Sequence, residues 1–319
     1  KQIYGVPLQF NDQKIISKLL KRLDLGEMVN INPFTIDVKD GIDSIKSYYR
    51  FFTDFNYYPE TNENFLLSTS ESIYNIGILG KYTGLQDSYL SLIRTIEHAS
   101  FKTNKKVKLI WLSAEDYTDD ESVVRCLEEN KINGIIIPGG FGIRGIENMI
   151  YFVKILRQIN IPCLGICLGL QIMIIEFLRT EYNLMCNSQE FVENCKIPAI
   201  VLIANSNKSL QKNKNKGGTL RTGLKKITIN PNSMSHSWYN NKTVIYERHR
   251  HRYIINIEYA DLLEKKDFVI SGYSTESDII ELMELKNHKF YVCCQYHPEF
   301  ISRKDNPHPL FVNFCKSLS

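Results

Sequence analysis

The sequence lacks the paired cysteines and long apolar runs that mark several common classes of protein. None of its 8 cysteines lies in a C-x-x-C pair, so the spacing gives no support for a thiolate metal site. The cysteines are scattered, and several lie in apolar stretches, which favours buried thiols in a reducing compartment over a secreted disulfide framework. We therefore predict a cytoplasmic protein with no metal bound to this chain.

Membrane and export signals are also missing. No apolar stretch is long enough to cross a membrane, and the opening KQIYGVPLQF has no signal-peptide layout. We expect no membrane partner. The absence of an initiator Met leads us to expect a processed chain or a part excised from a longer one.

The charge balance argues against a nucleic-acid partner. The formal net charge is +4, and four lysines of one polar segment match that excess: Lys208, Lys212, Lys214 and Lys216. That low-complexity segment, 205–217, predicts a mobile loop. Neither GILGKYTG nor GGTLRTGLKK fits G-x-x-x-x-G-K-[ST], so we expect no phosphate-binding loop.

From about residue 72 the chain alternates apolar runs with helical spacing. The runs rich in β-branched residues predict strands buried on both faces, at 74–80, 106–112, 134–138 and 161–166. Between and after them, helical patterns cover 86–100, 119–130, 146–158 and 168–179. The predicted fold class is α/β, with a doubly wound, mostly parallel sheet and helices on both faces.

The two ends of the chain have sequence patterns that differ from the alternating region between them. After about residue 195, shorter connections predict a smaller mixed or antiparallel sheet region, with strands at 225–229, 242–247, 267–274, 279–285 and 289–296 and a last helix at 309–318. Residues 1–30 predict a strand followed by a helix, and 31–71 predict an irregular linker. The main domain is therefore expected at 72–319.

Cys167 lies between two glycines, in Gly165-Ile166-Cys167-Leu168-Gly169. A strand that turns sharply into a helix exposes one side chain at its top and needs small neighbours, as in the G-x-S-x-G elbow of hydrolases. The helix N-terminus would favour a thiolate, and the Leu168 amide would face an oxyanion. The alternative is that the glycines serve only packing and Cys167 is a small core residue. Cys163, inside the strand, is expected to be buried and inert.

His297 is the histidine best placed to act as a base for this thiol. It follows the apolar run YVCCQY, and Glu299 stands two positions later. In an extended segment the two side chains point the same way, so Glu299 can hold the imidazole while it faces the cysteine. The alternative is an ordinary histidine at a strand end.

A glycine-rich turn, PGGFGIRG at 138–145, follows the apolar run GIIIP. Glycines let backbone N–H groups approach a ligand, and the strand order would place this turn beside Cys167. We interpret it as part of an oxyanion hole. A simple turn is the alternative.

With the distant HPEF, the stretch GICLGLQ resembles the class I (triad) glutamine amidotransferases. PGGFGIRG, GGTLRTG, ERHRHRY and QYHPEF narrow this to the glutaminase domain of the CTP synthase family, over about residues 72–319. IYGVPLQF and LLKRLDL resemble the tail of that family's synthetase domain. The resemblance implies that residues 1–30 are its remnant and that most of the amino-terminal half is missing.

The resemblance also implies roles for individual residues. Cys167 matches the nucleophile, His297 the general base and acid, and Glu299 its orienting partner. The amides of Gly140 and Leu168 match the oxyanion hole. The glutamine-binding positions are Gly140, Leu168, Gly169, Leu170, Gln171, Glu190 and Arg252. Loops with Arg144, Thr219 and Arg221 match those that respond to the activator GTP. For RHRHR, a basic nucleic-acid patch is the alternative.

The implied reaction is hydrolysis of L-glutamine to glutamate and ammonia. The full enzyme would pass ammonia to its synthetase domain, use ATP and Mg2+ to aminate UTP, and form a homotetramer. We expect no cofactor in this chain. The alternatives are another class I amidotransferase, a γ-glutamyl hydrolase, or a non-catalytic glutaminase-like binding module.

Overall fold

The computed structural model describes residues 65–66, 72–81, 86–203, 220–274 and 279–319. The chain divides into two compact units, 1–68 and 69–319, and β1 (Phe65–Leu66) belongs to the first. The expected remnant at 1–30 and the expected mobile loop at 205–217 lie outside the described residues. Within the expected linker at 31–71, the structure describes β1 alone. The domain boundaries at 30/31 and 71/72 therefore remain predictions.

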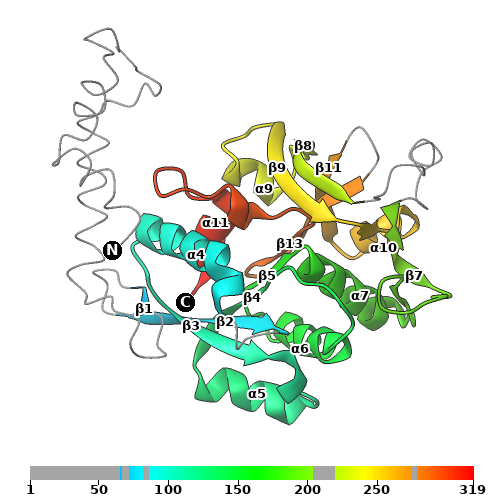
Figure 1. The fold of residues 1–319 in the computed structure, drawn as a ribbon, viewed down its shortest axis with the longest axis horizontal. Coiled ribbons are helices and arrows are strands. Elements are labelled where there is room, and N and C mark those ends of the chain that lie inside the picture. Colours follow the sequence, from blue (N-terminus) through cyan, green and yellow to red (C-terminus); the bar gives the residue numbers. More distant parts are fainter. Residues whose placement is uncertain (1–64, 67–71, 82–85, 204–219, 275–278) are drawn as a thin grey trace, which may run out of the picture. The chain divides into compact units, whose positions relative to one another are not determined.

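One large sheet forms the centre of the second unit (Figure 1). Its parallel part has the order β3-β2-β4-β5-β13. These strands are β2 (Ile73–Gly80), β3 (Lys106–Ser113), β4 (Ile132–Ile137), β5 (Cys163–Ile166) and β13 (Tyr291–Cys294). β5 and β13 are buried along their whole length, as expected for strands covered on both faces. The predicted parallel sheet is confirmed.

The antiparallel strands extend this same sheet. After β13 the order continues β12-β11-β8-β9, with antiparallel pairing throughout. Their bounds are β12 (Ile279–Leu285), β11 (Phe268–Ser274), β8 (Arg221–Ile229) and β9 (Val244–His251). A separate small mixed sheet has the order β10-β7-β6, from β6 (Asn187–Ser188), β7 (Pro198–Leu202) and β10 (Tyr253–Ile255).

Helices cover both faces of the parallel part (Figure 1). α4 (Leu90–Thr103) packs on α11 (Pro309–Ser317), and α6 (Ile146–Gln158) packs on α5 (Asp120–Glu129) and α7 (Leu168–Tyr182). The short helices are η2 (Gln86–Tyr89), η3 (Ala114–Asp116), α9 (Met234–Trp238), η5 (Ile257–Tyr259), α10 (Ala260–Lys265) and η6 (Pro298–Phe300). Within the described ranges, no helix has both the length and the apolar character needed to span a membrane.

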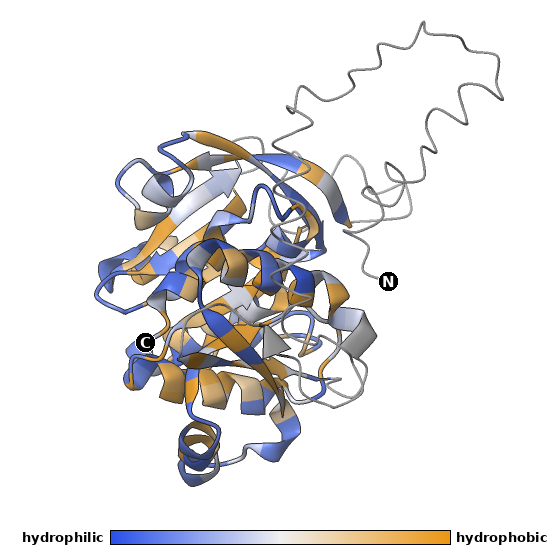
Figure 2. Cartoon of the chain, turned by 90° about the vertical axis from the view of Figure 1, so that its left-hand side faces the viewer, coloured by the Kyte–Doolittle hydropathy of each residue, from blue (hydrophilic) through white to orange (hydrophobic). Residues whose placement is uncertain are grey.

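α7 is the helix that fixes the site. Every side chain from Leu168 to Leu178 is buried, and Phe177 packs on Phe268 with ring centroids 4.9 Å apart. Figure 2 shows the apolar colouring concentrated on the central strands and on the helix faces turned toward them. Because α7 is held by packing on nearly all sides, the turn that leads into it has little freedom to move.

Candidate active site

Cys167 lies at the turn between β5 and α7, in a conformation that few non-glycine residues adopt. Its φ is 53° and its ψ is −95°, and its side chain is almost fully buried. A positive φ at a residue with a Cβ is strained, and such strain persists only where the surrounding structure imposes it. The sharp strand-to-helix turn predicted from the sequence is therefore present.

Both flanking glycines are required by close packing. A Cβ on Gly165 would lie 2.4 Å from the Sδ of Met173 and 2.8 Å from the carbonyl carbon of Gly169. A Cβ on Gly169 would lie 2.3 Å from the carbonyl oxygen of Ile137, at the end of β4. The glycines thus let β5, α7 and β4 approach closely enough to hold Cys167 at the crossing point.

The strand β13 brings His297 to this turn. β13 runs parallel to β5, and the N–H of Cys167 donates to the carbonyl of Cys294 at 2.7 Å. His297 Nδ1 and Glu299 Oε1 lie 2.7 Å apart. The expectation that the segment is extended was wrong, because Pro298 begins the 3-10 helix η6 there. The two side chains meet across that turn instead.

The electrostatic setting of His297 favours the imidazolium form. Burial lowers the pKa of His297, but hydrogen bonds and charge interactions with Cys167 and Glu299 outweigh it and raise the pKa to about 10. The imidazole therefore interacts with the Cys167 thiol as well as with the Glu299 carboxylate, to which its Nδ1 is hydrogen-bonded.

The glycine-rich turn after β4 lies against these groups. A Cβ on Gly139 would lie 2.7 Å from His297 Cε1 and 3.5 Å from the Cβ of Cys167. A Cβ on Gly140 would lie 3.1 Å from a methyl group of Leu168. Gly140 and Leu168, the two residues expected to supply oxyanion-hole amides, are therefore neighbours.

A cavity of about 350 Å³ opens over Cys167. Five of the expected site residues line it: Gly140, Cys167, Gln171, Glu190 and Arg252. Sequence reasoning missed the other lining residues: Phe141, Leu220, Arg250, His251 and Tyr253. All five lie within PGGFGIRG, GGTLRTG or ERHRHRY, so the motifs themselves were the available signal. Gly169 and Leu170 lie in the first turn of α7, outside this lining.

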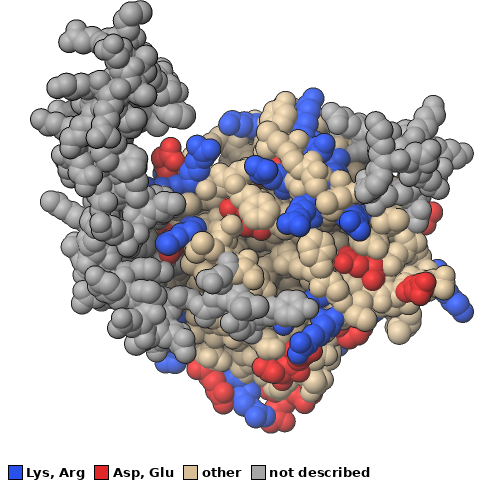
Figure 3. Space-filling view, in the orientation of Figure 1, with Lys and Arg blue, Asp and Glu red and all other residues tan. Residues whose placement is uncertain are grey.

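The RHRHR motif is divided between two faces of β9. Arg248 and Arg250 are exposed, whereas His249 and His251 are buried. Alternation along a strand explains this split. In the view of Figure 3, Lys and Arg side chains lie mainly over the upper part of the molecule, and Asp and Glu side chains lie mainly over its lower and right-hand parts. The motif thus presents its arginines, and not its histidines, on the exposed face of β9.

Arg144 and Arg221, two of the three residues expected to respond to GTP, lie outside the cavity lining. Arg144 forms an ion pair with Glu115 at the surface. Arg221 forms a buried ion pair with Glu281, with 2.6 Å between Nη2 and the carboxylate. Thr219 lies outside the described residues.

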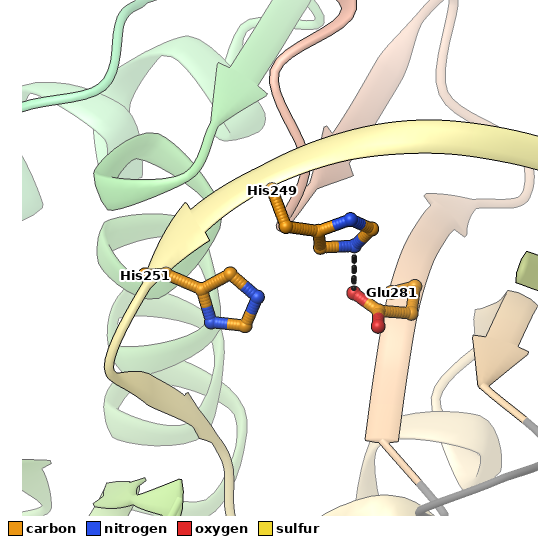
Figure 4. Close-up of side chains that lie close together, drawn as sticks. All are labelled: His249, His251 and Glu281. Carbon is orange, nitrogen blue, oxygen red and sulfur yellow. Dashed lines mark hydrogen bonds and ion pairs between the residues drawn. The ribbon is translucent and has the colours of Figure 1, made fainter. Parts of the chain in front are cut away.

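His249, His251 and Glu281 have the residue types of a metal site (Figure 4). His249 Nε2 lies 3.0 Å from Glu281 Oε2, however, and the other oxygen of this carboxylate accepts from Arg221. Burial alone would raise the pKa of Glu281, but His249 and Arg221 lower it, so the carboxylate is ionised. A cation would have to displace one of these partners beside the guanidinium charge. The cluster is better described as a buried ion-pair network.

The sequence matches the family Glutamine amidotransferase class-I over residues 84–317, and the chain belongs to that family. Among curated proteins it is similar to the CTP synthase of Sulfolobus acidocaldarius, at 45% identity over 76% of this chain and 45% of that protein. It is also similar to the CTP synthase of Saccharolobus solfataricus, at 39% identity over 99% of this chain and 54% of that protein. The chain thus spans about half the length of these relatives.

A solved structure supports the same assignment. The glutaminase domain of Trypanosoma brucei CTPS, with bound acivicin, superposes with a TM-score of 0.69 at 26% identity. The match covers 76% of this chain and 93% of that one. The expected amidotransferase fold is therefore confirmed.

Proposed function

We propose that this chain contains the glutaminase domain of a CTP synthase and hydrolyses L-glutamine to glutamate and ammonia. The observation that carries the proposal is the meeting of Cys167, His297 and Glu299 at the carboxyl ends of β5 and β13. A thiol, an imidazole and a carboxylate in contact are the parts needed for nucleophilic attack on an amide. The similarity to CTP synthases supports the choice of substrate.

In the proposed mechanism the Cys167 thiolate attacks the side-chain carbonyl carbon of glutamine. The N–H groups of Gly140 and Leu168 donate to the oxyanion that forms. The imidazolium of His297 then protonates the leaving nitrogen, so ammonia departs and a thioester remains. Neutral His297 next takes a proton from water, which attacks the thioester and releases glutamate. Glu299 holds the imidazole in place throughout.

The cavity walls suit the two ends of glutamine's amino-acid group. Glu190 would accept from the α-ammonium, and the guanidinium of Arg252 would bind the α-carboxylate through two parallel hydrogen bonds. Gln171 adds an amide whose Oε1 is buried without a hydrogen-bond partner among the described residues. Gly169 and Leu170 complete the proposed glutamine-binding set.

The proposal extends to the whole enzyme. The ammonia would reach a synthetase domain in a longer protein and aminate UTP, with ATP and Mg2+ bound in that domain. GTP would act as an activator through the loops of Arg144, Thr219 and Arg221. We further propose a cytoplasmic homotetramer with no nucleic-acid or membrane partner, and we assign no cofactor to this chain.

The test compares two neighbouring cysteines. Cys167→Ala should abolish both glutamate release and covalent labelling by an electrophilic glutamine analogue, with the wild-type adduct located on Cys167 by mass spectrometry. Cys163→Ala is the control, because this thiol is fully buried in β5 and burial raises its pKa. Equal activity in the Cys167→Ala chain would refute the nucleophile. Hydrolysis of γ-glutamyl peptides but not glutamine would indicate a γ-glutamyl hydrolase, and an unlabelled wild type would indicate a binding module.

A further inference from the structure

Lys81 is a buried lysine at the edge of the sheet where the site lies. It directly follows β2, the strand next to β4, and only 8% of it is exposed. Its ammonium donates to the carbonyl oxygen of Gly142 and lies 5.9 Å from the ring centroid of Phe191. Burial is costly for an ammonium group, and it lowers the pKa of Lys81 to about 8. The free-energy cost of burying this ammonium group indicates that Lys81 has a specific role.

The peptide groups of Gly142 connect Lys81 to the site. The backbone of Gly142 interacts with the Glu190 carboxylate and lowers its pKa, and the carbonyl oxygen of Gly142 accepts from Lys81. Gly142 has a φ of +85° with open space around its Cβ position, so glycine is needed there for its conformation. Three segments thus converge on one residue of the glycine-rich turn: the end of β2, the turn after β4, and the residues after β6.

We propose that Lys81 is a positioning residue that anchors the turn at 138–145 through the carbonyl of Gly142. Gly140, the proposed oxyanion donor, stands two positions earlier in the same turn. A glycine-rich turn has high conformational freedom, and an oxyanion hole acts only when its donors are already fixed. The hydrogen bond from Lys81 holds the carbonyl of Gly142 in place, which the flexible glycine backbone cannot do by itself. This inference rests on the proposed glutaminase function.

The same ammonium group also acts on Glu190. Burial raises the pKa of Glu190, whereas the backbone of Gly142 and the charges of Lys81 and Arg252 oppose that shift. Lys81 therefore helps to keep Glu190 ionised, as binding of a substrate ammonium requires. Removing its charge should weaken substrate binding as well as the oxyanion hole. The effect on kcat should be the larger one, because the oxyanion forms only in the transition state.

The test uses Lys81→Met and Lys81→Arg in the full chain. Lys81→Met should lower kcat by about 10- to 100-fold, part of the 10²–10³ that complete loss of an oxyanion donor costs, and should raise KM less. Lys81→Arg keeps a charged donor and should restore most of kcat. The control is Lys105→Met, since Lys105 also donates to backbone carbonyls, those of Lys316 and Leu318, but away from the cavity.

A pH profile separates positioning from simple stabilisation. In the wild type, kcat should decline as pH rises through about 8, where Lys81 loses its proton. The charged group that faces Lys81 is Glu190, which Arg252 faces in turn. This decline should disappear in Lys81→Met and move to higher pH in Lys81→Arg. Normal kcat and an unchanged profile in Lys81→Met would overturn the proposal.

Hydrogen exchange provides a readout that does not depend on catalysis. Amides of residues 138–145 should exchange faster in Lys81→Met than in the wild type and in Lys105→Met, and unchanged exchange would overturn the anchoring role. If wild-type Cys167 cannot be labelled, the glutaminase proposal fails, whereas the exchange comparison still decides the role of Lys81. If Lys81→Met does not fold by circular dichroism, wild-type exchange at pH 7 and pH 9 replaces it, and equal protection would refute anchoring.

Discussion

Replacing Gly169 by Ala should damage the site more than it damages the fold. The new Cβ would lie 2.3 Å from the carbonyl oxygen of Ile137, about 1 Å short of ordinary contact at 3.4 Å. The obstacle is backbone at the end of β4, so it cannot rotate away as a side chain could. The start of α7 and the end of β4 must therefore separate.

Overpacking of this kind costs typically 1–3 kcal/mol, and alanine returns at most about 0.5–1 kcal/mol in a helix. We expect a net loss of about 2 kcal/mol in the free energy of unfolding. For a unit of this size that is a fall of roughly 4–8 °C in Tm. A shift of about 1 Å at Cys167 should lower the labelling rate and kcat by about 10²-fold.

The assay combines thermal denaturation with the rate of labelling of Cys167. The control is Gly223→Ala, where a Cβ has no atom within 4 Å but φ is +79°, so backbone strain is the whole cost. It should lose about 1 kcal/mol of stability and keep the wild-type labelling rate. If Gly169→Ala keeps the wild-type Tm and labelling rate, close helix–strand packing does not hold the nucleophile.

Three further predictions concern the charged groups of the site. Glu299→Gln should lower kcat by about 10- to 100-fold, because a charge-assisted hydrogen bond of about 1.5–3 kcal/mol to His297 becomes a neutral one. Steady-state kinetics would measure this loss. An unchanged kcat would show that Glu299 has no part in the mechanism. Arg252→Lys should raise KM for glutamine by about tenfold or more with a smaller change in kcat, since lysine cannot form the bidentate hydrogen bond to the α-carboxylate. A loss in kcat larger than the rise in KM would contradict the binding role. The folded pKa of His297 is raised above its unfolded value, so its stabilisation is complete below pH 6.5 and is lost as pH rises toward about 10. The difference in unfolding free energy between the wild type and His297→Gln should therefore shrink over that range in urea titrations, and a constant difference would refute the raised pKa.

The first four parallel strands of the large sheet could be predicted because they are continuous β-branched runs, but their order could not. The run at 289–296 was expected in the mixed or antiparallel region, whereas β13 pairs parallel with β5. The helix at 146–158 and the strand at 279–285 have the bounds that periodicity predicts. The small sheet of β6, β7 and β10 was missed. Its strands are short, and β6 and β10 each pair with β7 in this sheet. No local pattern encodes such pairing.

The site could be predicted as a set of residues but not as a set of contacts. Cys167 and His297 were identifiable from glycine spacing and strand-end position. The route by which Glu299 reaches His297 was wrong, because Pro298 favours a helical start over an extended chain. Lys81 was set aside as part of a failed phosphate-loop motif. Its contact with Gly142 depends on β2 and β4 being neighbours, which only the folded sheet reveals.

The place of β13 has a consequence for how the protein is made. β13 joins the parallel strands to the antiparallel ones, and it carries the base to the nucleophile. A ribosome that has delivered everything up to β12 has produced Cys167 and its glycines but not His297. The thiol is therefore not activated by its imidazole during most of synthesis. Insertion of β13 connects the parallel and antiparallel parts of the sheet and brings His297 to Cys167. Activity would therefore show that these two parts of the sheet have assembled.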